Sequence, residues 1–541
     1  MAPLRVVCLG SGWVSFYLSK AIRPAVRRGD VDLTVIGREN FHTFHGFIPE
    51  MLVGRIQPTQ ILAPSRRLVQ PGRFVNAHIQ GIDLDRREIT VQRLLDTRTY
   101  TVPYDHLVLG LGSRDATDRG RGLAEHAFRL RNAYDALACR NHLISVLEMA
   151  ELEPDEAERR RLLTFVVAGG NFGGIEVASE LEEFAREAAR RTYPRLVPDE
   201  VRVVVVHPGA RILPELDPHH PTLLQWAEEY LATQRIEFRL GRRLASATAE
   251  EAVLDDGTRI PTRTIISCVG TGVNPLIAAL PFDRDERGRV RTDATGRVLG
   301  TENVWAAGDC AAIPHPKGGT CPPLAVWAMM EARRVGLNLG LVARRETPRP
   351  LGFSGLGDAC SLGRRRAVAH LKGFPIVGIA GWVTWRIFAL GFIPTWDRRL
   401  RLLLDWLLVP LSGREMVQMQ SSERVGVVRE VFEPGQEIVR QGELGSRLYL
   451  VAEGEVAVVQ RGDDGAERPL ATLGPGEHFG EMAVFKGTRR TATVRAVSRV
   501  AVLSLGKQEA VALSETVRTF GEELRAVPRA ATPAASPTIP S

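Results

Sequence analysis

The sequence predicts an α/β fold with two doubly wound, Rossmann-like parallel sheets, followed by a helical segment and a small β-barrel or jelly roll. Two apolar runs, Leu4–Leu9 and Leu162–Ala168, each pass through a glycine turn into an amphipathic helix. From about Met416 the pattern changes to short alternating strands that are separated by glycine turns. The length of 541 residues allows for several such domains.

The first glycine turn, Gly10-Ser11-Gly12, joins a buried strand to a helix that begins at Trp13. In this arrangement Gly10 makes the turn, Gly12 lets the backbone approach a pyrophosphate, and the helix N-terminus faces its negative charge. The third position of the fingerprint is Ser15, which is small enough to keep helix and strand close. The turn therefore predicts a dinucleotide site.

Two later segments complete this first site. The second strand, Val31–Ile36, is followed by Glu39, the nearest carboxylate that can hold the adenosine ribose. A further strand returns to the site and ends in Gly112.

The second glycine turn contains Gly169, Gly170 and Gly174, and Asn171 stands at the middle glycine position. Asn tolerates left-handed geometry but adds bulk where a pyrophosphate would lie. We therefore expect a second, altered dinucleotide site.

The strand after this turn ends at His207, where an NAD site carries Asp or Glu. The missing carboxylate removes repulsion against a 2′-phosphate, and Arg211 lies nearby, so that NADH and NADPH both stay open. The strand that ends near Gly270 should return to this second site.

A third strand-to-helix turn carries Gly308-Asp309. An Asp at this place is typical of flavoproteins with two dinucleotide domains, where it holds the ribityl and pyrophosphate region. It predicts that the first glycine turn binds FAD.

Composition narrows the partners. The net charge of +7 favours anionic ligands and acidic lipids, but no basic block is interleaved with aromatic residues, so we expect no nucleic acid. The six cysteines are scattered without metal-ligand or dithiol spacing, and His42 and His45 lack a third ligand, so we expect no metal. Because the first strand begins at Leu4, we expect no signal peptide.

The motifs LGSGW, VLGLGS, VVAGGNFGGIE, SCVGTG and VWAAGDCA follow one another in an order that resembles the pyridine nucleotide-disulfide oxidoreductase superfamily. More narrowly, residues 1–410 resemble the type II NADH dehydrogenases. The resemblance implies FAD on the first domain, NADH on the second, hydride transfer to the flavin, and reduction of a membrane quinone. Glu176 matches a family glutamate near the flavin and nicotinamide; the alternative is a solvated carboxylate in the first helical turn.

The sequence departs from this family in the acceptor region. The family carries A-Q-x-A-x-Q after Pro-Pro, whereas this chain has Ala325, Val326 and Met330 at the corresponding positions. The loss of both glutamines weakens the case for quinone, although an apolar tunnel for an isoprenoid tail stays open.

A long apolar segment, Gly373–Trp396, contains Arg386 at its centre, which opposes membrane insertion. Leucines then recur at helical spacing from Leu400 to Leu411, with basic residues opposite and Trp396 and Trp406 as interface formers. We expect peripheral attachment to an acidic membrane surface, on the cytoplasmic side of the inner membrane. A homodimer or domain interface and a membrane-spanning helix are the alternatives.

The C-terminal barrel resembles the cyclic-nucleotide-binding domain over residues 416–520. In that match Glu481, next to Gly480, accepts the ribose 2′-OH, and Arg490, next to Thr491, pairs with the cyclic phosphate of cAMP or cGMP. The alternative is a barrel that has lost its ligand and in which Glu481 and Arg490 form a salt bridge.

The predicted organisation assigns residues 1–150 and 291–350 to the FAD domain and 160–290 to the NAD(P)H domain. Residues 351–415 form the membrane-associating region, 416–525 the barrel and 526–541 a disordered tail. The predicted function is an FAD-dependent NAD(P)H:quinone oxidoreductase, with a cyclic nucleotide as effector. The alternatives are a nucleotide-sensing membrane adaptor with a degenerate reductase half, and a flavin disulfide or sulfide enzyme that uses Cys321 and Cys360.

Overall fold

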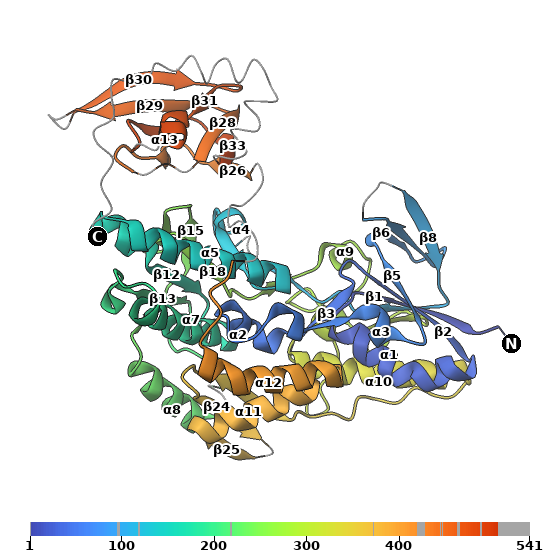
Figure 1. The fold of residues 1–541 in the computed structure, drawn as a ribbon. Coiled ribbons are helices and arrows are strands. Elements are labelled where there is room, and N and C mark those ends of the chain that lie inside the picture. Colours follow the sequence, from blue (N-terminus) through green and yellow to red (C-terminus); the bar gives the residue numbers. More distant parts are fainter. Residues whose placement is uncertain are drawn as a thin grey trace.

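The computed structural model describes residues 2–506, apart from 95–97, 117–118, 217–218, 372, 419–427, 444, 446, 463–465 and 487–488. The expected end of the barrel beyond 506 and the expected tail lie outside the described residues. Figure 1 shows a large two-sheet body with the β-barrel above it.

The first sheet is parallel and has the strand order β21-β9-β1-β2-β5. Helices α1 and α10 pack against each other and against apolar residues of this sheet (Figure 1). All first-sheet strands end toward the loops that carry the first glycine turn and Gly308-Asp309. The bounds are β1 Leu4–Leu9, α1 Trp13–Arg28, β2 Val31–Gly37, β5 Arg73–Asn76, β9 His106–Leu109, β21 Val304–Ala306 and α10 Ala325–Ala343.

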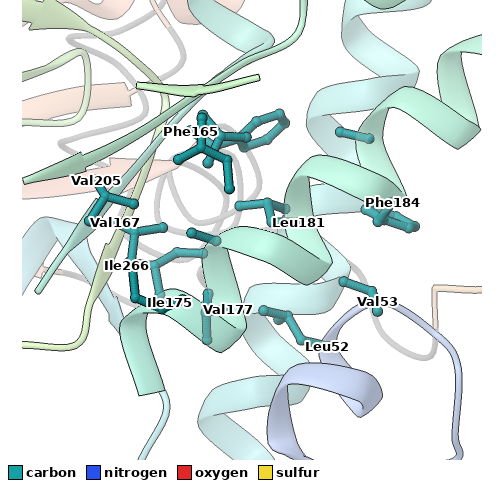
Figure 2. Packing of buried hydrophobic residues seen from close by; sticks show 14 of the residues in the cluster. Leu52, Val53, Phe165, Val167, Ile175, Val177, Leu181, Phe184, Val205 and Ile266 are labelled. Atoms are coloured by element: carbon teal, nitrogen blue, oxygen red, sulfur yellow. The ribbon is translucent and has the colours of Figure 1, made fainter. Parts of the chain in front are cut away.

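The second sheet is also parallel, in the order β11-β18-β12-β13-β14. Figure 2 shows side chains of its central strands, among them Val167 and Ile266, facing Ile175 and Leu181 of helix α7. Strand β11 joins this sheet although its residues lie within the expected first segment. The bounds are β11 Ala127–Arg129, α5 Ala133–Leu152, β12 Thr164–Ala168, α7 Phe172–Arg191, β13 Arg202–His207, α8 Pro221–Ala232, β14 Ile236–Leu240 and β18 Thr264–Ser267.

Smaller elements surround the two sheets. An antiparallel sheet, β15-β16-β17, projects from the second domain, and a three-stranded sheet, β6-β7-β8, extends the first. The bounds are β3 Phe41–Thr43, α2 Ile48–Leu52, β4 Leu62–Pro64, α3 Ser65–Val69, β6 His78–Asp83, β7 Glu88–Gln92, β8 Thr99–Pro103, β10 Arg114–Asp115, α4 Leu123–His126, α6 Glu156–Leu162, β15 Leu244–Ala247, β16 Glu251–Leu254, β17 Arg259–Pro261, β19 Thr271–Gly272, α9 Pro275–Ala278, β20 Val290–Arg291 and β22 Ala311–Ala312. The antiparallel pair β10 and β19 connects loops of the two sheets.

The segment after α10 forms a three-stranded antiparallel sheet and two helices that lie side by side in Figure 1. The apolar run thus divides into a strand and a short helix, and within the described part of the chain no helix is long and apolar enough to cross a membrane. The predicted amphipathic helix is present as α12. The bounds are β23 Gly357–Ser361, β24 Ala367–Leu371, β25 Phe374–Val377, α11 Gly378–Phe392 and α12 Trp396–Ser412.

The barrel consists of two four-stranded antiparallel sheets, β26-β33-β28-β31 and β27-β32-β29-β30, around an apolar core. This arrangement confirms the predicted small β-barrel. The bounds are β26 Val428–Phe432, β27 Glu437–Val439, β28 Arg447–Glu453, β29 Val456–Arg461, β30 Glu467–Leu473, β31 His478–Phe479, α13 Glu481–Lys486, β32 Thr493–Ala496 and β33 Val500–Gly506.

Candidate functional site

The first glycine turn is tightly packed at Gly10 and has free space beside Gly12. Gly10 has a φ of 109°, and a β-carbon on it would collide with the carbonyl oxygen of Gly110. A β-carbon on Gly12 would meet nothing within 4 Å, and no side chain caps helix α1 there. The first amide groups of α1 therefore lack a side-chain acceptor, which suits a phosphate group.

Side chains of the predicted set surround this turn. Ser15 is buried and donates from Oγ to the carbonyl oxygen of Gly12 at 2.9 Å. Ser11 donates to Glu39 Oε2 at 3.3 Å, which places that carboxylate beside the turn. The Trp13 ring packs edge-on against the His42 ring at 4.4 Å.

The turn at Gly308-Asp309 lies against the start of helix α1. A β-carbon on Gly308 would contact Val14 of α1 at 2.9 Å. Ser113 donates from Oγ to Asp309 Oδ2 at 3.0 Å, and burial raises the pKa of Asp309. Three segments far apart in the sequence therefore meet at the carboxyl ends of the first sheet, where ligands bind in open α/β sheets.

Glu331 also belongs to this region, although the sequence analysis missed it. Its Oε2 accepts a hydrogen bond from the Gly308 amide at 2.7 Å, and burial raises its pKa to about 7. The signal that could have found it is that it is the only acidic residue of α10, where it precedes the two arginines Arg333 and Arg334.

A cavity of about 490 Å³ adjoins Asp309. This volume lies within the range of small-molecule and cofactor sites, about 300–1,000 Å³. Loops of both sheets line it, and the predicted residues Gly112, Gly270 and Asp309 contribute to its wall, as do Ser113, Arg119 and Arg289.

The second glycine turn is satisfied by the protein itself. Asn171 caps helix α7 by accepting from the Gly174 amide at 2.9 Å, and it donates to the Cys268 carbonyl oxygen at 3.0 Å. The Gly170 amide donates to Nδ1 of His207 at 3.1 Å, and burial lowers the pKa of this histidine. The amide of Phe172 donates to a Glu215 carboxylate oxygen at 3.2 Å.

A β-carbon on Gly169 would collide with the backbone of Cys268, so the turn passes close to the loop that follows β18. Arg211, the residue considered for a 2′-phosphate, is paired with Glu228 at 2.6 Å.

Glu176 is the fifth residue of α7, beyond the first turn that the sequence suggests, and it is held by the rest of the protein. Its Oε1 accepts from the Ser361 amide of β23 at 3.0 Å. Burial raises its pKa to about 8, and the negative charges of Glu50, Glu180 and Glu215 add to this shift. The carboxyl group is therefore mostly protonated at neutral pH.

The expected acceptor residues lie at the start of α10. Ala325 is exposed, whereas Val326 and Met330 are half-buried. Val326 packs against the apolar cluster that also contains Trp327.

The charge within the apolar segment is accommodated by an inward ion pair. Arg386 is 8% exposed and donates to Glu50 Oε1 at 2.8 Å. Its guanidinium lies 4.2 Å from the Trp382 ring centre and 4.3 Å from that of Trp406. Helix α11 can therefore keep its other side apolar.

We define the apolar face as the exposed large hydrophobic side chains of β25, α11 and α12. Its most exposed member, Phe374, has 72% of its surface accessible. The members are Phe374, Val377, Ile379, Val383, Ile387, Trp396, Leu400, Leu403, Leu404, Leu407 and Leu408. An uncovered set of this size on neighbouring elements marks an interaction surface.

In the barrel, Arg490 is buried and packs against Gly445 and Gly480. It donates to the carbonyl oxygens of Gly480 and Arg447, each at 2.8 Å. A β-carbon on Gly480 would collide with its guanidinium. Glu481 is half-buried at the start of α13, and Thr491 is exposed.

Comparison with known proteins identifies both parts of the chain. The model of the pyridine nucleotide-disulphide oxidoreductase family matches residues 4–332. The model of the cyclic nucleotide-binding domain matches residues 429–516, which confirms the predicted C-terminal domain.

Individual relatives cover most of the body. A probable NADH dehydrogenase of Dictyostelium discoideum is 27% identical over 76% of this chain and 90% of its own. The type II NADH:quinone oxidoreductase NdhA of Mycobacterium tuberculosis is 27% identical over 79% of this chain and 91% of its own. The structure of NDH2 from Plasmodium falciparum in complex with NADH has a TM-score of 0.70 at 16% identity, and covers 76% of this chain and 99% of its own.

Proposed function

Since the chain belongs to the pyridine nucleotide-disulphide oxidoreductase family and is an oxidoreductase, we propose that it is an FAD-dependent NADH:quinone oxidoreductase of the type II kind. The observation that carries this proposal is the cavity of about 490 Å³, where Gly112 and Asp309 meet Gly270 from the second sheet. The reaction balances as NADH, one proton and quinone giving NAD⁺ and quinol.

The residues of the first site fit FAD. The open backbone at Gly12 and the uncapped start of α1 suit its pyrophosphate, and Glu39 beside Ser11 suits the adenosine ribose. Asp309, with one oxygen bonded by Ser113, has acceptor capacity for ribityl hydroxyl groups. When bound, the flavin supplies the hydride-accepting centre.

The second site supports NADH as the reductant. Because His207 replaces the usual carboxylate and its pKa is lowered by burial, this position would not repel the 2′-phosphate of NADPH. However, Arg211, the cation that could bind a 2′-phosphate, is paired with Glu228, and this favours NADH. NADPH is the alternative that a direct comparison of the two reductants tests.

Glu176 provides a proton to the acceptor in this proposal. Ser361 occupies Oε1, which leaves Oε2 to carry the proton, and a pKa near 8 keeps it protonated at neutral pH. A group with such a pKa suits general acid catalysis near neutral pH.

The apolar face supports docking on the cytoplasmic surface of the inner membrane, where quinone is available. Its leucines and Trp396 can enter the lipid interface, and neighbouring arginines such as Arg398 and Arg401 can contact acidic headgroups. Half-buried Val326 and Met330 then present an apolar wall to the isoprenoid tail. Pairing of two copies through this face is the competing use.

The disulfide alternative is disfavoured by the cysteines themselves. Cys321 and Cys360 are buried. Burial raises the pKa of Cys321 to about 12 and that of Cys360 well above its ordinary value. Reactive cysteines require the opposite shift.

An absorbance measurement on the purified protein tests the proposal. We expect a flavin spectrum that NADH bleaches without oxygen and that a soluble quinone restores. A protein without flavin would contradict the proposal and favour the membrane adaptor. A flavin that NADH reduces but quinone does not reoxidise would contradict the proposal that quinone is the electron acceptor.

The barrel adds an effector to this proposal, namely cAMP or cGMP. Gly480, Glu481 and Arg490 occur at the spacing of the family, and Arg490 lies against Gly480 in the structure. Calorimetry with each nucleotide on the wild type and on Arg490→Ala tests this; equal heats in both proteins would contradict it.

A further inference from the structure

We call the barrel surface around Arg440, Tyr449 and Arg490 the mouth of the barrel. It faces an acidic turn of the second domain. This turn, Thr248–Glu251, connects β15 to β16, and the Glu250 and Glu251 amides each donate to the Thr248 hydroxyl at 3.2 Å. Together with Arg263, the turn and the barrel line a cavity of about 50 Å³ that includes Arg490 and Tyr449. The same arginine that the proposed effector needs thus lies at the boundary between the two domains.

The acidic turn is held rigidly on the side of the body. Glu250 accepts from Arg161 at 2.8 Å and from Arg263 at 2.6 Å, one bond to each carboxylate oxygen. Glu251 accepts from Arg259 at 2.9 Å. These bonds fix the position of both carboxylates on the side of the body.

Polar contacts cross the boundary at several points. Arg440 lies 3.4 Å from Glu251, and Arg489, the neighbour of Arg490, lies 2.8 Å from Asp155. His126 of α4 lies 3.1 Å from Glu430 of β26. These contacts dock the barrel with its mouth against the body.

Among the described residues, the space at this boundary is too small for a nucleotide. A space of about 50 Å³ is well below the roughly 300 Å³ at which small-molecule sites begin. The negative charge of Glu250 already interacts with the Arg490 guanidinium, so a cyclic phosphate at Arg490 would compete with it for this partner.

We infer that the acidic turn and a cyclic nucleotide compete for the mouth of the barrel, so that nucleotide binding requires the barrel to leave the turn. This inference rests on the proposed effector function of the barrel. By linkage, a change that weakens docking strengthens nucleotide binding, at most by the same factor.

The test compares nucleotide affinity in the wild-type full chain and in Asp155→Asn/Glu251→Gln, which removes two cross-boundary ion pairs. Asn retains the helix cap that Asp155 provides to α6. We expect cAMP or cGMP to bind the variant about two- to tenfold more tightly, since partly exposed ion pairs contribute modestly. The matched control is Asp199→Asn, which removes an exposed ion pair with Arg235 on the same domain.

Hydrogen exchange in the wild type provides the second readout. Saturating nucleotide should accelerate exchange of the amides of residues 248–251, whereas it should leave the distant strand β1 unchanged. Equal affinity of wild type and variant, with an unaltered turn, would overturn the competition while the effector role stands. No binding to either protein would overturn the effector role and the competition with it.

Discussion

The two glycine turns of the body have similar sequences but differ in whether protein side chains bind their backbone amides. At the first turn, no side chain caps α1, and Gly12 borders open space. At the second, Asn171 and His207 already satisfy the Gly174 and Gly170 amides. Unsatisfied amides at a helix start favour an anionic ligand strongly, whereas satisfied ones gain less from it. The first turn therefore suits a cofactor that stays bound, and the second a cofactor that comes and goes.

The largest effect is expected from Gly12→Ala. The added methyl group meets no protein atom but would occupy the space for the pyrophosphate, so the purified variant should keep its fold and lose most of its flavin. The ratio of flavin absorbance to protein absorbance measures the flavin content. Thermal unfolding measures whether the fold is retained. Full flavin content in this variant would contradict the assignment of the first turn.

Gly10→Ala is the matched comparison for the same turn. Here the methyl group would collide with Gly110, and the left-handed φ of 109° adds backbone strain. We therefore expect loss of flavin together with a lower melting temperature. Equal melting temperatures for the two variants would show that the turn can shift to accept a side chain.

Glu176→Gln should have the next largest effect. It removes the transferable proton, and the rate of quinone reduction should fall by about 10²- to 10⁴-fold, while reduction of the flavin by NADH stays nearly unchanged. Stopped-flow measurement of each half-reaction separates the two steps. A similar loss in both would indicate that Glu176 positions the nicotinamide instead.

The same residue predicts a pH dependence. Because burial raises the pKa of Glu176 to about 8, the carboxyl group is protonated below that pH and loses its proton above it. Quinone reduction by the wild type should therefore decline as the pH rises through about 8, and the profile of Glu176→Gln should lack this decline. A flat wild-type profile from pH 6 to 9 would contradict the proton-donor role.

The sequence predicted the features that depend on local pattern. Periodicity and turn residues predict the strand–glycine–helix units, the amphipathic helix α12 and the barrel. The resemblance to two families, both of which match, added the expected ligands and activity. The sequence could not show that Asn171 also donates to the Cys268 carbonyl oxygen, because the fold brings this partner from a distant segment.

Long-range pairing was equally hidden. Arg386 argues against burial when read alone, and only the arrival of Glu50 and two tryptophan rings from distant positions makes its buried site favourable. Glu331 and the acidic turn at Glu250 gain their importance in the same way, through contacts with segments far away in the chain.

The smallest effect is expected at the second turn, where Asn171→Gly restores the glycine fingerprint. Gly costs only a few tenths of a kcal/mol relative to Asn as a helix cap, and the lost bond to the Cys268 carbonyl oxygen adds about 1 kcal/mol, so the melting temperature should fall by a few degrees at most. The Gly174 amide loses its side-chain acceptor and becomes available to a pyrophosphate. The KM for NADH should therefore fall about two- to fivefold, with flavin content unchanged. Steady-state kinetics at saturating quinone measures this KM. An unchanged or higher KM would mean that the cap by Asn171 does not limit NADH binding. The difference between the two turns would then have no effect on function.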